Sequence, residues 1–360
     1  MKPRERIQIA LNHQTPDRCP MHIGFTPEFA ERLRADLRSK GIELHPASDP
    51  DSLFELERAL GVDMLVNWVG WANCYYQDFP EYVDEWGVGW RSVPYSTPFG
   101  AGRYTEMVHH PLATDQAVAS YRAPDPLRPQ LYESVARVLR DYRADYWIVG
   151  ATVCTIFECA WALRGFERLL MDFARNPEIA HAILRIPFEY HLAAAKRLVE
   201  MGVDMIWIGD DVGSQRAMLI SPAHWRKYLK PLMAEFISEI KTLNPALKVA
   251  YHSDGLVTPI IPELIEIGLD ILNPIQPACM DPAKLKTEFG DRLCFWGSID
   301  EQFTLPFGAP EQVRQEVLLR LNTIGKGGGL IIGPTHHVQL DTPMENFWTM
   351  VETIQNTPYH

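Results

Sequence analysis

The sequence lacks the features that would place the chain in a membrane or on a nucleic acid. No stretch approaches the roughly 18 consecutive apolar residues that a membrane-spanning helix needs. The net charge is -12 at pH 7, and no block of consecutive lysines or arginines could follow a phosphate backbone. The N-terminal residues also lack the apolar centre of a signal peptide. We therefore expect a cytoplasmic protein that binds neither membranes nor nucleic acid.

Cysteine pairs and phosphate-binding glycine loops are absent as well. The six cysteines show no CxxC spacing, so we interpret them as free thiols packed in the core in a reducing compartment. The glycine cluster at 327–329 precedes an apolar run instead of opening a helix, unlike a dinucleotide or P-loop fingerprint. The sequence therefore predicts no nicotinamide or ATP site.

What the sequence does contain is a repeated alternation of short apolar runs and helical segments. Of its 360 residues, 46% are hydrophobic and 22% are charged, the balance of a globular protein. Apolar runs followed by helical periodicity, as at 177–201 and 222–243, are typical of βα units around a parallel sheet. We predict one α/β domain over 1–360, a (β/α)8 TIM barrel with an N-terminal helical extension. The predicted strands are 21–24, 64–66, 147–150, 205–208, 249–252, 271–275, 293–296 and 330–332.

Residues 67–128 interrupt the alternation with an aromatic and proline-rich insertion. Two interpretations are open: a β-hairpin with turns near Gly87 and Gly89, or a long loop over the barrel mouth. Insertions of this size in a compact domain are usually functional. We expect this one to close over the substrate.

Polar side chains follow two of the predicted strands, where barrel enzymes build their active sites. The strand 249–252 ends in His252 and is followed by Asp254, while the strand 330–332 leads to His336. Two imidazoles and a carboxylate with open positions suit zinc or non-haem iron. The alternative is a hydrogen-bonded His–Asp pair that acts as acid or base without a metal. Both interpretations require the three side chains to converge at the barrel mouth.

Further candidates lie just beyond other strands. Asp210 and Asp211 follow 205–208; one should face the mouth and the other cap a neighbouring segment, and Asp210 is our preferred inward residue. Glu158 is either a buried general acid or a helix N-terminal carboxylate. Cys154 is a thiolate ligand, a nucleophile or a packed thiol. The remaining candidates are His337 as a catalytic residue, and His22 and Gln276, with Cys154, as cofactor-binding residues.

Several stretches, taken in order, resemble the uroporphyrinogen decarboxylase superfamily, which includes corrinoid-dependent methyltransferases acting on coenzyme M or tetrahydrofolate. The chain opens with RERIQIALNHQTPDRCP, and DEWGVGWR with the later HHPLA is similar to the insertion of the methyltransferase-like branch. GDDVGSQRAMLISPAHWRKYLKPL, HSDG, FWGSIDEQFTLPFGAPEQVRQEV and DTPMENF follow in the family's order. The resemblance covers nearly the whole chain and implies a (β/α)8 barrel.

The resemblance also implies a metal site and a reaction. Methyltransferase members hold zinc through a His-x-Cys pair and a later Cys; His252 matches the first ligand, Asp254 stands at the first Cys position and His336 at the last. These departures replace soft sulfur donors by oxygen and nitrogen. We expect methyl transfer between a small methyl donor or acceptor and a corrinoid (cobalamin), bound directly or carried by a partner protein. The metal would be zinc or another divalent ion such as iron, and a homodimer is compatible with the sequence.

Two other functions stay open at this point. Uroporphyrinogen decarboxylases carry an arginine-rich RQAGRY element after the first strand, whereas this chain has FTPEFAERLR there, so an anionic tetrapyrrole would lack counter-charges. A metal-independent decarboxylase using His336 and an aspartate is the first alternative. The second is a non-catalytic barrel that binds a corrinoid protein or a small ligand.

Overall fold

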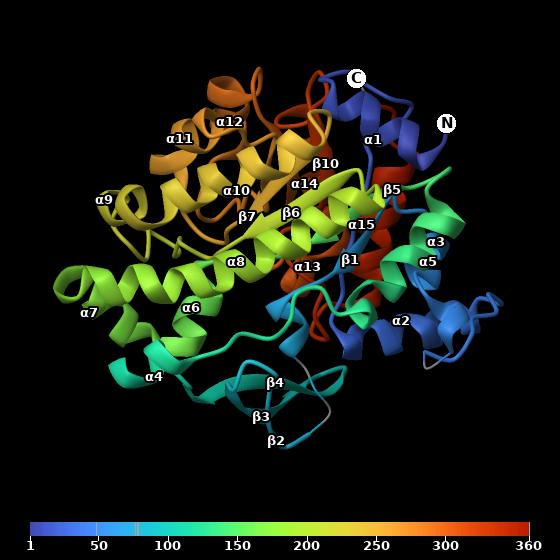
Figure 1. The fold of residues 1–360 in the computed structure, drawn as a ribbon. Helices are drawn as coiled ribbons and strands as arrows, with labels where there is room; N and C mark the ends of the chain where they lie inside the picture. Colours follow the sequence, from blue (N-terminus) through green and yellow to red (C-terminus); the bar gives the residue numbers. More distant parts are fainter. Residues whose placement is uncertain (48, 76, 78, 360) are drawn as a thin grey trace.

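The computed structural model, which describes residues 1–47, 49–75, 77 and 79–359, is built around a curled parallel sheet (Figure 1). Seven strands pair in the order β1-β5-β6-β7-β8-β9-β10. Their burial is nearly complete along their length, as expected for a parallel sheet covered by helices. The strands are β1 (Met64–Trp68), β5 (Trp147–Ala151), β6 (Met205–Gly209), β7 (Lys248–His252), β8 (Ile271–Asn273), β9 (Cys294–Ile299) and β10 (Leu330–Pro334).

The predicted first strand at 21–24 is present as an extended segment but not as a strand of this sheet. Met21 forms an isolated parallel bridge with Ile332 of β10, and its carbonyl accepts the N–H of Asp63 just before β1. The N–H of Met21 donates to the Asp63 carboxylate at 2.7 Å instead of to a backbone carbonyl. This N–H is therefore not used for backbone pairing with a neighbouring strand. Seven predicted strands are therefore confirmed and the fold is TIM-barrel-like, while closure by an eighth strand stays a prediction.

Helices cover the outside of the sheet (Figure 1). The helix predicted at 177–201 is confirmed as α8 (Pro177–Met201). The segment 222–243 is divided into α9 (Pro222–His224), a π-helical turn (Trp225–Leu229) and α10 (Lys230–Leu243), and Pro231, which lacks an amide hydrogen, adjoins that turn. No helix in the described part of the chain is long and apolar enough to cross a membrane. The other main helices are α1 (Pro3–Leu11), α2 (Pro27–Ser39), α5 (Glu133–Tyr142), α6 (Phe157–Arg164), α7 (Phe166–Arg175), α12 (Pro282–Phe289), α14 (Pro310–Asn322) and α15 (Met344–Asn356).

The insertion contains a three-stranded antiparallel sheet, so the β-hairpin interpretation is confirmed. Its strands are β2 (Glu81–Val83), β3 (Gly89–Thr97) and β4 (Gly100–His109). The first turn is held by Asp84, whose Oδ1 accepts the N–H groups of Trp86 and Val88, and Gly87 supplies its positive φ of 82°. The prediction of a turn at Gly89 is wrong, because Gly89 is paired with His109 inside the sheet.

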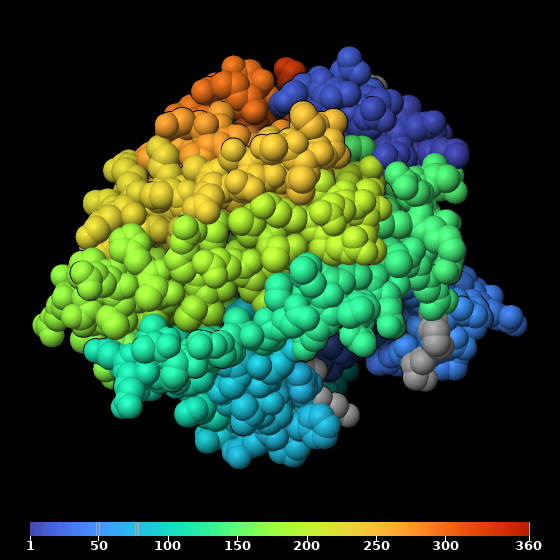
Figure 2. Space-filling view, in the orientation of Figure 1, coloured from blue at the N-terminus to red at the C-terminus, as the bar shows by residue number. Residues whose placement is uncertain are grey.

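The insertion packs against the rim of the barrel at the end away from α1 (Figures 1 and 2). At its tip, the Arg32 guanidinium of α2 lies 4.2 Å from the centre of the Phe99 ring, and the N–H of Arg103 donates to Glu28. At its start, the N–H of Trp71 donates to Nε2 of His191 in α8 at 3.1 Å. The insertion is thereby fixed to two helices of the barrel.

Candidate functional site

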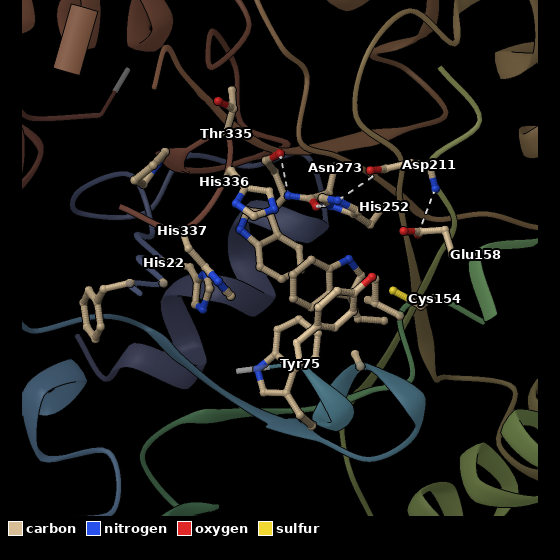
Figure 3. A pocket seen from close by; sticks show the side chains of 18 of the residues that line it. His22, Tyr75, Cys154, Glu158, Asp211, His252, Asn273, Thr335, His336 and His337 are labelled. Atoms are coloured by element: carbon tan, nitrogen blue, oxygen red, sulfur yellow. Dashed lines mark hydrogen bonds and ion pairs between the residues drawn. The ribbon is translucent and has the colours of Figure 1, made fainter. Parts of the chain in front are cut away.

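A cavity of about 490 Å³ lies where the carboxyl ends of the strands meet (Figure 3). Its lining draws on β1, β6, β7, β8, β9 and β10, on the segment just after β5 and on the extended segment near His22. Ala72, Asn73 and Tyr75 from the start of the insertion also line it, while closure of the insertion over a substrate stays a prediction. This is the place where TIM-barrel enzymes carry out their chemistry.

The three predicted metal ligands converge at this mouth. His252, Asp254 and His336 each offer one donor atom, and these atoms lie within 4.8 Å of one another. The imidazole rings of His252 and His336 have their centres 6.1 Å apart, and Nε2 of His252 is 4.0 Å from Oδ1 of Asp254. That Oδ1 is buried and has no hydrogen-bond partner. The arrangement leaves room for an ion to be the missing partner.

Hydrogen bonds fix the orientation of His252. Its Nδ1 lies 2.6 Å from Oδ1 of Asn273, and Nδ2 of Asn273 donates to the carbonyl of Trp296 at 3.2 Å. Because the Asn273 amide nitrogen is used as a donor there, its oxygen must accept from His252, so Nδ1 carries the proton. The lone pair of Nε2 is then free on the side of Asp254 and Asp211, as a metal ligand requires.

The loop that carries His336 is held by Glu301. The backbone N–H of His336 donates to Oε2 of Glu301 at 2.9 Å, and the N–H of Thr335 donates to the carbonyl of Ile299. Burial raises the pKa of Glu301 well above its usual range, and the charge of Asp254 raises it further. The side chain of His336 is itself exposed at the mouth.

The two aspartates after β6 have the opposite orientations to those expected. Asp211 lines the cavity, and its Oδ1 accepts the N–H of Asp254 at 2.7 Å. Asp210 is buried and accepts the N–H groups of Ile156 and Glu158 at the start of α6. The preference for Asp210 as the inward residue is thus corrected, because its side chain instead satisfies the free amides of a helix N-terminus. Burial raises the pKa of Asp210 to about 7.

Glu158 is a buried carboxyl group at a helix N-terminus, and its role as a general acid stays a prediction. It lies at the first turn of α6 and also lines the cavity, where its Oε2 accepts the N–H of Asp211 at 3.0 Å. Burial raises the pKa of Glu158 well above its usual range, and the charges of Asp211 and Asp210 raise it further. These surroundings favour the protonated form of Glu158, and a cation in the cavity would favour the ionised form.

Cys154 lines the cavity as a neutral thiol. Burial raises its pKa well above the usual range, and the charges of Glu158 and Asp210 act in the same direction. Its backbone has a positive φ of 62°, a conformation uncommon for residues other than glycine. These surroundings oppose a thiolate. All six cysteines lie in the described part of the chain and are free thiols; five are buried and Cys279 is half-buried.

Of the three remaining candidate residues, two line the cavity and one does not. His22 and His337 line the cavity, and burial lowers the pKa of each to about 3, so both rings are neutral. Gln276 does not line the cavity as we expected of a cofactor-binding residue. Its Oε1 instead accepts the N–H of Gly255 at 2.9 Å and so holds the turn that follows Asp254.

The loops after β6 and β7 are in direct backbone contact. A Cβ atom on Gly213 would lie 2.5 Å from the carbonyl oxygen of Asp254, and one on Gly255 would lie 2.6 Å from the nitrogen of Ser214. The N–H of Leu256 also donates to the carbonyl of Ser214. The loops that carry Asp211 and Asp254 therefore pack without space for side chains between them.

The sequence analysis missed the aromatic wall of the cavity. The ring centres of Trp68 and Trp207 are 5.2 Å apart, and those of Trp207 and Trp296 are 4.3 Å apart. Tyr75 lines the same cavity from the insertion (Figure 3). Alternation along β6 was an available signal, because residues 207, 209 and 211 share one face of an extended segment. An inward Trp207 predicts an inward Asp211.

Comparisons with known proteins agree with this architecture. The chain is 27% identical over 177 residues to a methylcobamide:CoM methyltransferase MtaA of Methanosarcina barkeri, with 49% of each chain covered. It is 28% identical over 195 residues to a uroporphyrinogen decarboxylase of Chlorobium phaeobacteroides, with 52% of each covered. The chain thus spans about half the length of the curated relatives it matches.

A solved structure and a family model extend the comparison. A methyltransferase from Methanosarcina mazei superposes with a TM-score of 0.71 at 19% identity, covering 99% of this chain and 98% of the other, and so shares the fold. The model of the uroporphyrinogen decarboxylase (URO-D) family matches residues 98–357. Because that match takes in most of the chain, including every strand of the sheet after β1, the protein belongs to the uroporphyrinogen decarboxylase family.

Proposed function

We propose that the protein is an enzyme that transfers a methyl group between a small molecule and a corrinoid carried by a partner protein. A divalent metal ion would be held by His252, Asp254 and His336. The observation that carries this proposal is the convergence of their donor atoms within 4.8 Å at the carboxyl end of the sheet. The similarity to methylcobamide:CoM methyltransferases supports the corrinoid as the reaction partner.

The residues present fit a metal ion. Oδ1 of Asp254 is buried without a partner, and the hydrogen bond to Asn273 leaves Nε2 of His252 free to bind. Two imidazoles and one carboxylate are a donor set that zinc and iron(II) both accept. When bound, such an ion supplies a Lewis acid that stabilises negative charge on an acceptor or leaving atom.

The side chains of the cavity would position the small molecule and handle its protons. The wall of Trp68, Trp207 and Trp296 excludes water and supplies apolar contact area. Glu158, neutral through burial, can donate a proton, while Asp211 lies 3.6 Å from Nε2 of His252 and can accept one. These roles require no thiolate from Cys154.

Elemental analysis of the purified protein tests the metal site. We expect about one zinc or iron per chain, lost in His252→Ala and His336→Ala but kept in His181→Ala, whose exposed side chain lies on α8. Methyl transfer should stop when a chelator removes the ion and return when the ion is restored. Full methyl-transfer activity in metal-free protein would refute the proposed role of the metal.

Decarboxylation is the second candidate, because uroporphyrinogen decarboxylases are matched at similar identity. No lysine or arginine occurs among the described residues that line the cavity, so a substrate with many carboxylates finds no counter-charge there. Release of carbon dioxide from a carboxylated substrate, insensitive to chelators, would favour this function over methyl transfer.

A further inference from the structure

We propose that the small molecule bound by this cavity is a methylated ammonium cation, held between the aromatic wall and the carboxyl groups of Glu158 and Asp211. The inference rests on the proposed function in one respect, since it takes this cation to be the methyl-bearing molecule. The binding site itself is inferred from the composition, charge and contacts of the cavity lining.

The charged groups of the lining are of one sign. Glu158 and Asp211 line the cavity, Asp254 lies at its mouth, and the lining residues that the structure describes include neither lysine nor arginine. Burial lowers the pKa of His22 to about 3, so its ring is neutral. An anion would therefore be repelled, whereas a cation would relieve the repulsion between the carboxylates.

The carboxyl groups of Glu158 and Asp211 lie next to each other in the lining. Oε2 of Glu158 accepts the N–H of Asp211 at 3.0 Å, and both residues line the cavity. Asp210 takes no part, because its carboxylate accepts the amides at the start of α6.

The aromatic residues of the lining have the chemistry that recognises methylated ammonium groups. Trp68, Trp207 and Tyr75 line the cavity, and the ring centres of Trp68 and Trp207 are 5.2 Å apart. The faces of such rings attract a cation within about 6 Å of their centres, and methyl groups on the nitrogen pack against them. Trp68 is half-buried and so keeps part of its surface toward the cavity.

Methyl transfer from such a cation balances without another reagent. One N–CH3 bond breaks and leaves its electron pair on nitrogen, which gives a neutral amine. A reduced corrinoid of the partner supplies the electron pair of the new bond to the methyl group. No proton, oxidant or further reductant is consumed.

Calorimetry with choline and its neutral isostere 3,3-dimethylbutan-1-ol tests the charge requirement on the full chain. We expect choline to bind at least about tenfold more tightly, because the two probes differ in charge and hardly in shape. Glu158→Gln should weaken choline binding and leave the isostere unaffected. Equal affinity for the two probes, or no choline binding at millimolar concentration, would overturn the inference.

Substitutions of the aromatic wall test whether its rings contribute to binding of the cation. Trp68→Leu should weaken choline binding about fivefold or more, while Trp68→Phe, which keeps a ring face, should lose less. Trp348→Leu on α15, remote from the cavity, is the matched control. Thermal unfolding of each variant identifies those that fail to fold. Unchanged choline binding in Trp68→Leu would also contradict the inference.

Metal content separates this inference from the proposed function. Choline binding is measured on the protein with and without added zinc, and it needs neither corrinoid nor turnover. If the ion binds at His252, Asp254 and His336 but choline does not, the cation site is refuted and the metal-dependent function stands. If choline binds and no metal does, the cation site stands and the metal-dependent function is refuted.

Discussion

Nδ1 of His252 and Oδ1 of Asn273 are 2.6 Å apart, and this hydrogen bond decides which ring nitrogen of His252 is available at the mouth of the cavity. Asn273 comes from the adjacent strand, β8, which pairs with β7 at His252. The sheet itself therefore sets the tautomer of a candidate metal ligand.

Asn273→Leu removes this support while it keeps a side chain of similar size. We expect the affinity for zinc, measured by competition with a chelator, to fall about 10- to 100-fold, because the ring of His252 loses its fixed tautomer and orientation. Asn273→Asp keeps an acceptor for Nδ1–H and should retain more of the affinity. Equal losses in both variants would contradict the explanation.

Asp210 and Asp211 should respond differently to substitution. Asp210→Ala leaves the buried amides of Ile156 and Glu158 unpaired, and should lower the free energy of unfolding by about 2 kcal/mol or more. Asp211→Ala should change unfolding by less than about 1 kcal/mol, since its side chain is partly exposed, yet weaken choline binding. Urea denaturation and calorimetry on both variants measure the two effects. Similar destabilisation by both would argue against the assigned orientations.

His191 makes stability depend on pH. In the folded chain its Nε2 accepts from Trp71 and its Nδ1–H donates to Pro187, and burial lowers its pKa from about 6.5 to about 4. Below pH 6.5 the unfolded chain takes up a proton that the folded chain does not, so stability falls as pH decreases toward 4. The slope contributed by this one residue approaches about 1.4 kcal/mol per pH unit.

Denaturant unfolding between pH 6.5 and 4.5 isolates this contribution. His191→Gln should be less stable than the wild type at pH 7, because the bond to Trp71 is altered, but its stability should fall less steeply with acid. His22 and His337 are unchanged in the variant and contribute equally to both slopes. If the unfolding free energy of the wild type and of His191→Gln falls equally steeply with decreasing pH, His191 is not the titrating group.

Asp63 should be the most sensitive carboxylate at the amino end of the sheet. It is fully buried, binds Arg6 at 2.5 Å and Arg18 at 2.7 Å, and accepts the N–H of Met21. Asp63→Ala removes the buried carboxylate that Arg6 and Arg18 share, leaves Arg6 with only Asp17, and should cost about 3–5 kcal/mol in unfolding free energy. The control Asp17→Ala removes a more exposed partner of Arg6 and should cost about 1 kcal/mol or less.

The sequence was sufficient to predict elements whose apolar pattern is local. Seven strands and the helix at 177–201 were predicted because each is a short apolar run or a long periodic segment. The convergence of His252, Asp254 and His336 also followed from topology, since carboxyl ends of parallel strands meet at one edge. The orientations of Asp210 and Asp211 were predicted wrongly, although alternation along β6 favours an inward Asp211.

Two other features depended on long-range contacts. The role of Gln276 depends on the turn after β7, 21 residues earlier in the chain, which no spacing rule connects to it. The segment at 21–24 was predicted as a strand from its apolar residues, but the buried Asp63 carboxylate takes the N–H of Met21. In both cases a side chain competes with backbone pairing, and only the packed structure shows the outcome.

The contact between the two glycine-containing loops has a mechanical consequence. Gly213 and Gly255 bring the chain after β6 and the chain after β7 so close that neither can shift alone without a clash. A side chain at either glycine would push these loops apart, and the spacing between Asp211 and Asp254 would change in one step.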